Sequence, residues 1–507
     1  MSYVFFASAG DDADPLRPSH GPAKQACRLR FRQDRRSGGS GAPGGIGALL
    51  RGVAAPAQLP APSPSLALLL ALLATSAVAP SLAAAQGRGY YFRGNQSALT
   101  GRAQSTTSND VGALWYNPAG LAGNTATSID ATGTAFVLRR RAVRRGLVTR
   151  LPSGDEVAKD VDASFAGIVA PSVGMIREVR PGLSLGLASF IAQSDSMRLV
   201  GEADADLGNG ERVRSRLTVE QNLATYHIGP GFGLKLGEHW RIGASLFAAY
   251  EQSSVNGLGV LSIGNGDDVF AGSLSVFRNR ATLGLEAVAG TQWLPTPDWN
   301  VGFAVRAPRY VVLESVDNEN SIIRADAEGG LDVSLDRQAV DSHLGALVTP
   351  LVLQLGVTKR FSRGTLSIDG DVGQPLGGSE LQRRRKFSWN ARVGGTLDIT
   401  PQWTLGGGIG TNHSDFKPPE IPLDSAIDFY TATMAVQKET PICFRKNGDD
   451  TNPDLMLTTL LSVKYGIGIG EAGAVVGDVE SGSVGTSERS DLIFHDVTIY
   501  LGSGIRF

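Results

Sequence analysis

The end of the chain alternates between apolar and polar side chains with a period of two. Over His495–Phe507, one parity carries the apolar side chains Val497, Ile499, Leu501, Ile505 and Phe507. Successive side chains of a β-strand point to opposite faces of the sheet, so a period of two is the repeat of a strand. A helix would need apolar positions three or four residues apart, and this segment is therefore restricted to a two-faced strand.

Segments of about ten residues with this alternation are the sequence signature of transmembrane β-barrels. Such segments begin near Ser128, Ala163, Leu183, Leu223, Trp240, Leu274, Val301, Leu351, Leu366, Phe387, Trp403, Ile427, Leu457 and His495. Their number, about fourteen, is even, as a single-chain bacterial barrel requires. The sequence predicts an all-β fold, a transmembrane antiparallel β-barrel of about 14 strands over residues 125–507.

The connections between these segments differ in length on the two sides of the predicted barrel. Short turns follow even-numbered segments, as at 177–182 and 237–239, and long polar stretches follow odd-numbered ones, as at 194–221 and 314–348. Short periplasmic turns and long external loops are typical of outer-membrane barrels. Both ends of the barrel are therefore expected in the periplasm. The connection at 438–453 is long for that side.

The composition is compatible with this fold. Mean hydropathy is -0.03 and 19% of residues are charged, which is the average that alternating polar and apolar positions produce. A soluble β-sandwich would alternate in the same way and is the alternative. The formal net charge of -2 gives no argument for a nucleic-acid partner. The 64 glycines suit curved strands and a crowded lumen.

An export signal precedes the predicted barrel. The apolar run at 66–79 is too short for a membrane-spanning helix and is followed by an A-x-A cleavage pattern ending at Ala85. This pattern assigns residues 53–85 to a signal peptide and makes Gln86 the first mature residue. Residues 1–52, rich in Arg, Gly and Ser, are predicted to be a spurious or disordered extension.

Cysteine is scarce. Cys27 would leave with the export signal, so Cys443 would be the single thiol of the mature protein and no internal disulfide would form.

Residues 86–124 alternate little and carry a specific string. Gly101-Arg102-Ala103, Asn109-Asp110 and the stretch ALWYNPAGLA at 113–122 resemble the amino-terminal hatch of the FadL/TodX family of outer-membrane transporters for long-chain fatty acids and other hydrophobic molecules. The resemblance implies that residues 86–124 form a hatch inside the barrel lumen. The hatch and gating residues that it implies are Trp115, Tyr116, Asn117, Pro118, Ala119 and Gly120.

The same resemblance implies a function in the bacterial outer membrane. Hydrophobic compounds, long-chain fatty acids among them, would be captured at external loops, pass the hatch and leave sideways into the membrane. In the family a bend in the third strand opens the wall, which here points to 183–193 with Gly186 as the weak point. Bacterial outer-membrane barrels often end in Phe as part of their assembly signal, so Phe507 implies the barrel-assembly machinery as a partner.

Other signals are weaker. Arg306 and Arg392 lie on the inward parity of their strands and are candidate contacts for a ligand carboxylate, while pairing with Asp or Glu is the alternative. Arginines at 139–145, assigned to the first external loop, and at 383–385 are candidates for lipopolysaccharide phosphates or ordinary loop charges. His227 also points inward, but no catalytic spacing accompanies it. No enzyme, cofactor or metal site is predicted.

Two other classes of barrel remain open at this point. A general diffusion porin would need an open polar lumen without a hatch, and a structural or adhesive barrel would bind a partner through its long loops. The inward residues of the predicted strands are too mixed to decide the polarity of the lumen.

Overall fold

A computed structural model describes residues 91–507 except 152–153, 170–171, 207–211, 266–267, 326–330, 337–341, 377–383, 419–424, 443–454 and 479–482. The predicted extension, signal peptide and cleavage site, and also Cys443, lie outside the described residues. No helix in the described part of the chain is long and apolar enough to cross a membrane.

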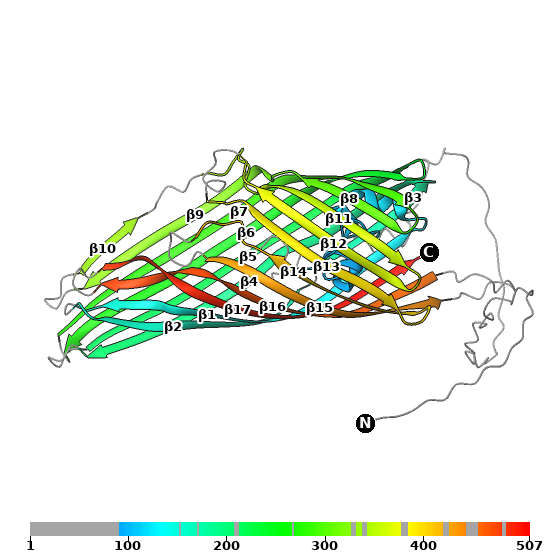
Figure 1. Cartoon of the computed structure of the whole chain (residues 1–507). Coiled ribbons are helices and arrows are strands. Elements are labelled where there is room, and N and C mark those ends of the chain that lie inside the picture. Colours follow the sequence, from blue (N-terminus) through cyan, green and yellow to red (C-terminus); the bar gives the residue numbers. More distant parts are fainter. Residues whose placement is uncertain are drawn as a thin grey trace, which may run out of the picture. The chain divides into compact units, whose positions relative to one another are not determined.

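The described chain forms one sheet of seventeen strands that closes into a barrel, with a short helical segment inside it (Figure 1). The strands are β1 (Ser128–Arg150), β2 (Glu156–Val169), β3 (Ser172–Arg180), β4 (Leu183–Asp206), β5 (Arg212–Leu236), β6 (Trp240–Asn265), β7 (Asp268–Thr296), β8 (Trp299–Arg306), β9 (Tyr310–Ala325), β10 (Leu331–Asp336), β11 (Leu351–Phe361), β12 (Gly364–Gln374), β13 (Ser388–Asp398), β14 (Trp403–Asn412), β15 (Ser425–Ile442), β16 (Leu455–Asp478) and β17 (Ser483–Arg506).

Three pairs of these segments each act as one barrel strand. β2 and β3 both pair with β1, and β8 and β9 both pair with β7. β10 pairs with β9 and β11 pairs with β8, so β10 and β11 together also form one barrel strand. Pro308 lies in the break between β8 and β9, where a residue without an N–H cannot continue the ladder. The barrel thus has fourteen strands, as predicted from the alternation.

Both ends of the barrel meet at one rim. β1 and β17 are antiparallel from the Ser128↔Arg506 pair to the Val143↔Leu492 pair, which closes the sheet. Beyond the last pair, the backbones of Thr127 and Phe507 exchange two hydrogen bonds of 3.0 and 2.9 Å. The short turns that precede β4, β6, β8, β12 and β14 lie at this same rim. The predicted sidedness of the connections is confirmed.

The outer surface near this rim is apolar. On β6, exposed side chains run outward from Trp240 through Ile242 and Leu246 to Tyr250, and on β13 from Leu397 through Val393 to Trp389. On β6 the aromatic ends of the row, Trp240 and Tyr250, are ten residues apart, roughly 25 Å of height for a tilted strand. That is the apolar band of a membrane-embedded barrel.

Beyond this band several strands continue, and the predicted long loops at 194–221 and 314–348 are largely strand. β4 runs to Asp206 and β5 starts at Arg212, so the predicted loop is mostly a protruding hairpin. Its outer face carries cross-strand ion pairs, which include Glu202 with Arg216 at 3.2 Å and Asp204 with Arg214 at 3.0 Å. The pattern inverts where the strands leave the membrane: polar side chains face outward and apolar ones face the lumen.

Candidate functional site

Residues 91–124, here called the lumenal segment, fold inside the barrel near the rim that holds the C-terminus (Figure 1). The segment contains helices α2 (Asn95–Leu99) and α3 (Ala113–Tyr116) and the 3₁₀ helix η1 (Pro118–Gly123). All six residues that the sequence implied for the hatch are buried here, from Trp115 to Gly120. The structure therefore places them together inside the lumen, against β5, β6 and β7.

Asn117 joins α3 and η1 and fixes this turn to the wall. Its Nδ2 donates to the carbonyl of Ser105 at 2.8 Å and to that of Thr291 on β7 at 3.0 Å. Its Oδ1 accepts from the backbone N–H of Ala119 at 3.2 Å and so caps η1. The side chain is fully buried and lies against Gly290, where a Cβ would overlap with it.

Glycines in the wall let the lumenal segment approach the strands closely. A Cβ at any of several inward glycines would overlap with the segment's backbone. These positions are Gly233, Gly243, Gly302, Gly394, Gly406 and Gly408. Asp369 on β12 adds a polar anchor, because its Oδ2 accepts from the backbone N–H groups of Gln104 at 2.6 Å and Ser105 at 2.7 Å. The high glycine content is thus partly explained by contacts with the lumenal segment.

Trp115 lies between two guanidinium groups. The Cζ atoms of Arg93 and Arg306 are 4.0 and 3.9 Å from its ring centroid. Arg306 also donates to the carbonyl of Trp115 at 2.8 Å, and the ring of His227 meets the indole edge-on at 4.7 Å. Cation–π contacts of this kind contribute about 2 kcal/mol when desolvated. Arg306 of β8 and His227 of β5 hold α3 against the wall, and Arg93 supports Trp115 from within the lumenal segment.

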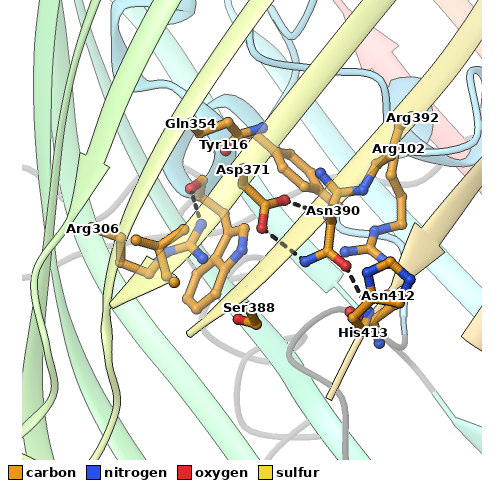
Figure 2. A pocket seen from close by; sticks show the side chains of 13 residues that line it. Arg102, Tyr116, Arg306, Gln354, Asp371, Ser388, Asn390, Arg392, Asn412 and His413 are labelled. Carbon is orange, nitrogen blue, oxygen red and sulfur yellow. Dashed lines mark hydrogen bonds and ion pairs between the residues drawn. The ribbon is translucent and has the colours of Figure 1, made fainter. Parts of the chain in front are cut away.

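Arg306 and Arg392, selected from the sequence, line one cavity together with Arg102 of the lumenal segment (Figure 2). Arg392 Nη2 is 2.5 Å from Asp371 Oδ2, and Arg306 Nε is 3.6 Å from Glu286 Oε1. Both arginines therefore have carboxylate partners, which was the alternative interpretation of their inward position.

Positive charge is nevertheless in excess at this cavity, because Arg102, Arg306 and Arg392 line it with the single carboxylate of Asp371. Burial, assisted by the charge of Arg392, lowers the pKa of Arg102 to about 10, and burial lowers the pKa of Arg93 to about 10 as well. Both groups remain cationic at neutral pH. The surroundings of Trp115 therefore favour an anion over a cation.

The lumen on the external side of this segment is apolar. One cluster of buried side chains includes Val137 and Val143 of β1 with Phe429, Leu492 and Phe494. A second, farther out, consists of Leu147, Val161, Ala163, Met197, Leu199, Ala203, Leu217 and Val219. Two cavities lie among these side chains, and both have Arg141 and Met197 in their walls. The polarity of the lumen, which the sequence left open, is therefore mainly apolar in this outer part, with Arg139 and Arg141 adding charge at its inner end.

The wall of the barrel has a poorly paired seam between β2 and β4. β3 pairs with β4 up to Ser172↔Phe190, and β2 pairs with β4 only at Asp162↔Val200. Between these pairs the ladder is missing, although β1 pairs with β2 and β5 with β4 along the same stretch. β4 also shifts register against β5 between Ile191 and Gln193. This seam adjoins the inner of the two cavities, the one that both Arg139 and Arg141 line.

Gly186, the weak point suggested from the sequence, lies outside the seam. It pairs with Ile176 of β3 and with Gly231 of β5. A Cβ at this position would touch Leu114 of the lumenal segment, so its small size serves contact with α3. The irregularity of β4 comes later along the strand, at the register shift.

Arg139 and Arg141 were assigned to an external loop and instead point into the lumen from β1. Their neighbours Arg140 and Arg144 face outward. The run of arginines resembled a loop in the sequence, but β1 extends to Arg150 and its basic residues alternate between the two faces of the strand. Arg139 bonds to Asp496 at 3.4 Å, and Lys464 lies 3.2 Å from the other oxygen of that carboxylate.

No family model matches this sequence, and no curated protein sequence matches it. Solved structures do match. A FadL homologue from Pseudomonas aeruginosa aligns with a TM-score of 0.52 and 12% identity, over 84% of this chain and 99% of that chain. The chain has the FadL fold.

Two further channels match with TM-scores below 0.5. The P. putida toluene transporter TodX aligns at 13% identity and a TM-score of 0.48, over 83% of this chain and 98% of its own. The monoaromatic hydrocarbon channel CymD aligns at 13% identity and 0.41, over 82% and 97%. At such identities the likeness concerns the FadL fold alone.

Proposed function

We propose that this protein is a member of the FadL/TodX family in the bacterial outer membrane and takes up hydrophobic compounds, with long-chain fatty acids as the main class. The observation that carries the proposal is the route from the outer lumen to the seam between β2 and β4, which is apolar in its outer part and has Arg139 and Arg141 at the seam. The lumenal segment fills the other route, along the barrel axis. A porin would need the axial route open.

Physical chemistry favours such a path. The sugar layer outside the cell is polar, and a water-filled pore gives an alkyl chain no apolar contacts. An apolar lumen stabilises the chain by about 0.8 kcal/mol for each buried CH₂ group. Release through the wall places the chain in lipid without returning it to water. Arg140 and Arg144, which face outward from the outer half of β1, are the proposed contacts for lipopolysaccharide phosphates.

The hatch residues act as the seal in this proposal. Trp115 and Asn117 hold the lumenal segment against the wall, and Pro118, Ala119 and Gly120 fill the space beside β5 and β6. Arg306 and Arg392 border the open cavity next to Trp115, and the excess positive charge there suits a ligand carboxylate. Competition between that carboxylate and the carbonyl of Trp115 for Arg306 would couple ligand binding to movement of α3.

Uptake of radiolabelled oleate into cells expressing the protein tests the proposal. Leu217→Gln places a polar amide in the apolar route, and we expect uptake to fall about tenfold. Thr218→Gln, one residue along on the opposite face of β5, is the matched control and should transport normally. Equal uptake by both variants, or unselective conductance by the wild type, would favour the porin interpretation.

A further inference from the structure

The seam between β2 and β4 is bridged from inside by one cluster of side chains. Arg139 Nη1 donates to the carbonyl of Ser194 on β4 at 3.2 Å, and its Cζ lies 5.7 Å from the ring of Phe165 on β2. The hydroxyl of Tyr91 donates to the same carbonyl at 2.7 Å. Arg139 Nη2 donates to that hydroxyl at 2.9 Å. Two strands that lack a ladder here are therefore joined through side chains.

This cluster belongs to three parts of the molecule. Arg139 comes from β1, Ser194 from the part of β4 beyond its register shift, and Tyr91 from the lumenal segment. Asp496 of β17 holds Arg139 from behind at 3.4 Å. Tyr91 is fully buried, and Arg139 is 6% exposed. Charge-assisted hydrogen bonds in a site with so little water are stronger than their equivalents at a surface.

The adjoining cavity combines two cations with an apolar wall. Arg139 and Arg141 border it together with Phe165, Met197 and Phe494. Arg141 approaches the face of Phe494, with its Cζ 5.1 Å from the ring centroid. A ligand that suits these walls has an alkyl or aryl body and an acidic head group, which guanidinium groups bind in bidentate fashion.

We propose that Tyr91, Arg139 and the carbonyl of Ser194 form a clasp that closes the seam, and that an acidic head group bound by Arg139 and Arg141 releases it. The carboxylate replaces the Ser194 carbonyl as the acceptor of Arg139. Tyr91 then loses one of its two partners in the cluster. The strands β2 and β4 separate, and the apolar body of the ligand reaches the lipid through the seam.

This inference rests on the proposed function for its ligand, but the state of the seam can be measured without transport. Registers on either side of the gap place Ser164 of β2 opposite Arg198 of β4, and both face outward. Spin labels at Ser164→Cys and Arg198→Cys, in a Cys443→Ser background, report the width of the seam by double electron–electron resonance. Labels at Glu202→Cys and Arg216→Cys, a directly paired position of β4 and β5, provide the control distance.

Oleate should raise the fraction of barrels with a wide seam about tenfold, and oleyl alcohol, which has the same chain without a charge, should not. Tyr91→Phe keeps the ring and removes the hydroxyl, so it should widen the seam without ligand by a similar factor, the effect of about 1.4 kcal/mol. Arg139→Gln should widen the seam and abolish the response to oleate. Tyr465→Phe, which removes a hydroxyl that bonds to His495 on the outer face of the barrel, is the matched control.

A seam of unchanged width in Tyr91→Phe and Arg139→Gln would overturn the clasp. An equal response to oleate and oleyl alcohol would overturn the role of the head group. Oleate uptake measured on the same variants separates this inference from the proposed function. A seam that widens with oleate in a wild-type protein that transports none would reject transport and support the clasp.

Discussion

Replacement of Asn117 by alanine should detach the lumenal segment from the barrel wall. The change removes the hydrogen bonds to the carbonyls of Ser105 and Thr291 and the cap on Ala119. At about 1 kcal/mol for each buried hydrogen bond, the loss is about 3 kcal/mol. An equilibrium constant changes tenfold for every 1.4 kcal/mol, so the detached population should rise about 100-fold.

Two measurements test this expectation. Hydrogen exchange followed by mass spectrometry should show faster exchange for residues 112–124 in Asn117→Ala, and planar bilayers should show new conductance along the barrel axis. Gly290→Ala should act in the same way from the wall side, because its methyl group would overlap with Asn117 Oδ1. Asn222→Ala removes side-chain hydrogen bonds within the barrel and leaves the lumenal segment untouched. Wild-type exchange and conductance in Asn117→Ala would refute the reasoning.

Three further predictions concern separate parts of the molecule. Phe507→Ala should lower the amount of folded, heat-modifiable barrel in the outer membrane, while Ile505→Ala, on the same outward face, should not. Arg392→Met should lower the free energy of unfolding by about 3 kcal/mol because it leaves Asp371 buried without its cation. In thermal unfolding, the double variant Arg392→Met, Asp371→Leu should regain most of this stability. Burial raises the pKa of Asp110 above its ordinary 3.8, so the folded state holds this proton more tightly than the unfolded state. Protection of the lumenal segment against hydrogen exchange should therefore fall as the pH rises from 3.8 through the raised pKa of the folded state. Asp110→Asn should flatten that dependence in hydrogen exchange corrected for its intrinsic rate.

The strands of the barrel could be predicted because their alternation is imposed locally by two environments. Lipid outside and a polar interior select opposite side chains at successive positions, so the predicted starts fall within or one residue from observed strands, as at Ser128, Leu183 and Trp240. The protruding hairpins were misread as loops for the same reason. Outside the membrane the outward face is polar, and Glu202 and Arg216 resemble loop residues until their cross-strand pairing is known.

Only part of the candidate site could be predicted from the sequence. The string around Asn117 identified the residues of the lumenal segment through resemblance, but its contacts with Thr291 and Gly290 join residues more than 170 positions apart and have no local signal. The seam was missed because a missing ladder leaves the alternation of each strand intact. Arg139 could have been placed in the lumen by extending the parity of Val137 one step further along β1.

The arrangement of polar and apolar contacts in the lumen separates two tasks. The lumenal segment is held by Asn117, by Asp369 and by arginines around Trp115, groups that lose much stability when an alkyl chain replaces their partners. The alkyl chain of a ligand therefore gains little by displacing this segment. The outer lumen offers apolar side chains instead, and burying a chain of about sixteen CH₂ groups there would contribute on the order of 13 kcal/mol before the costs of binding. The ligand is thus directed towards the seam, where the wall has no ladder to break.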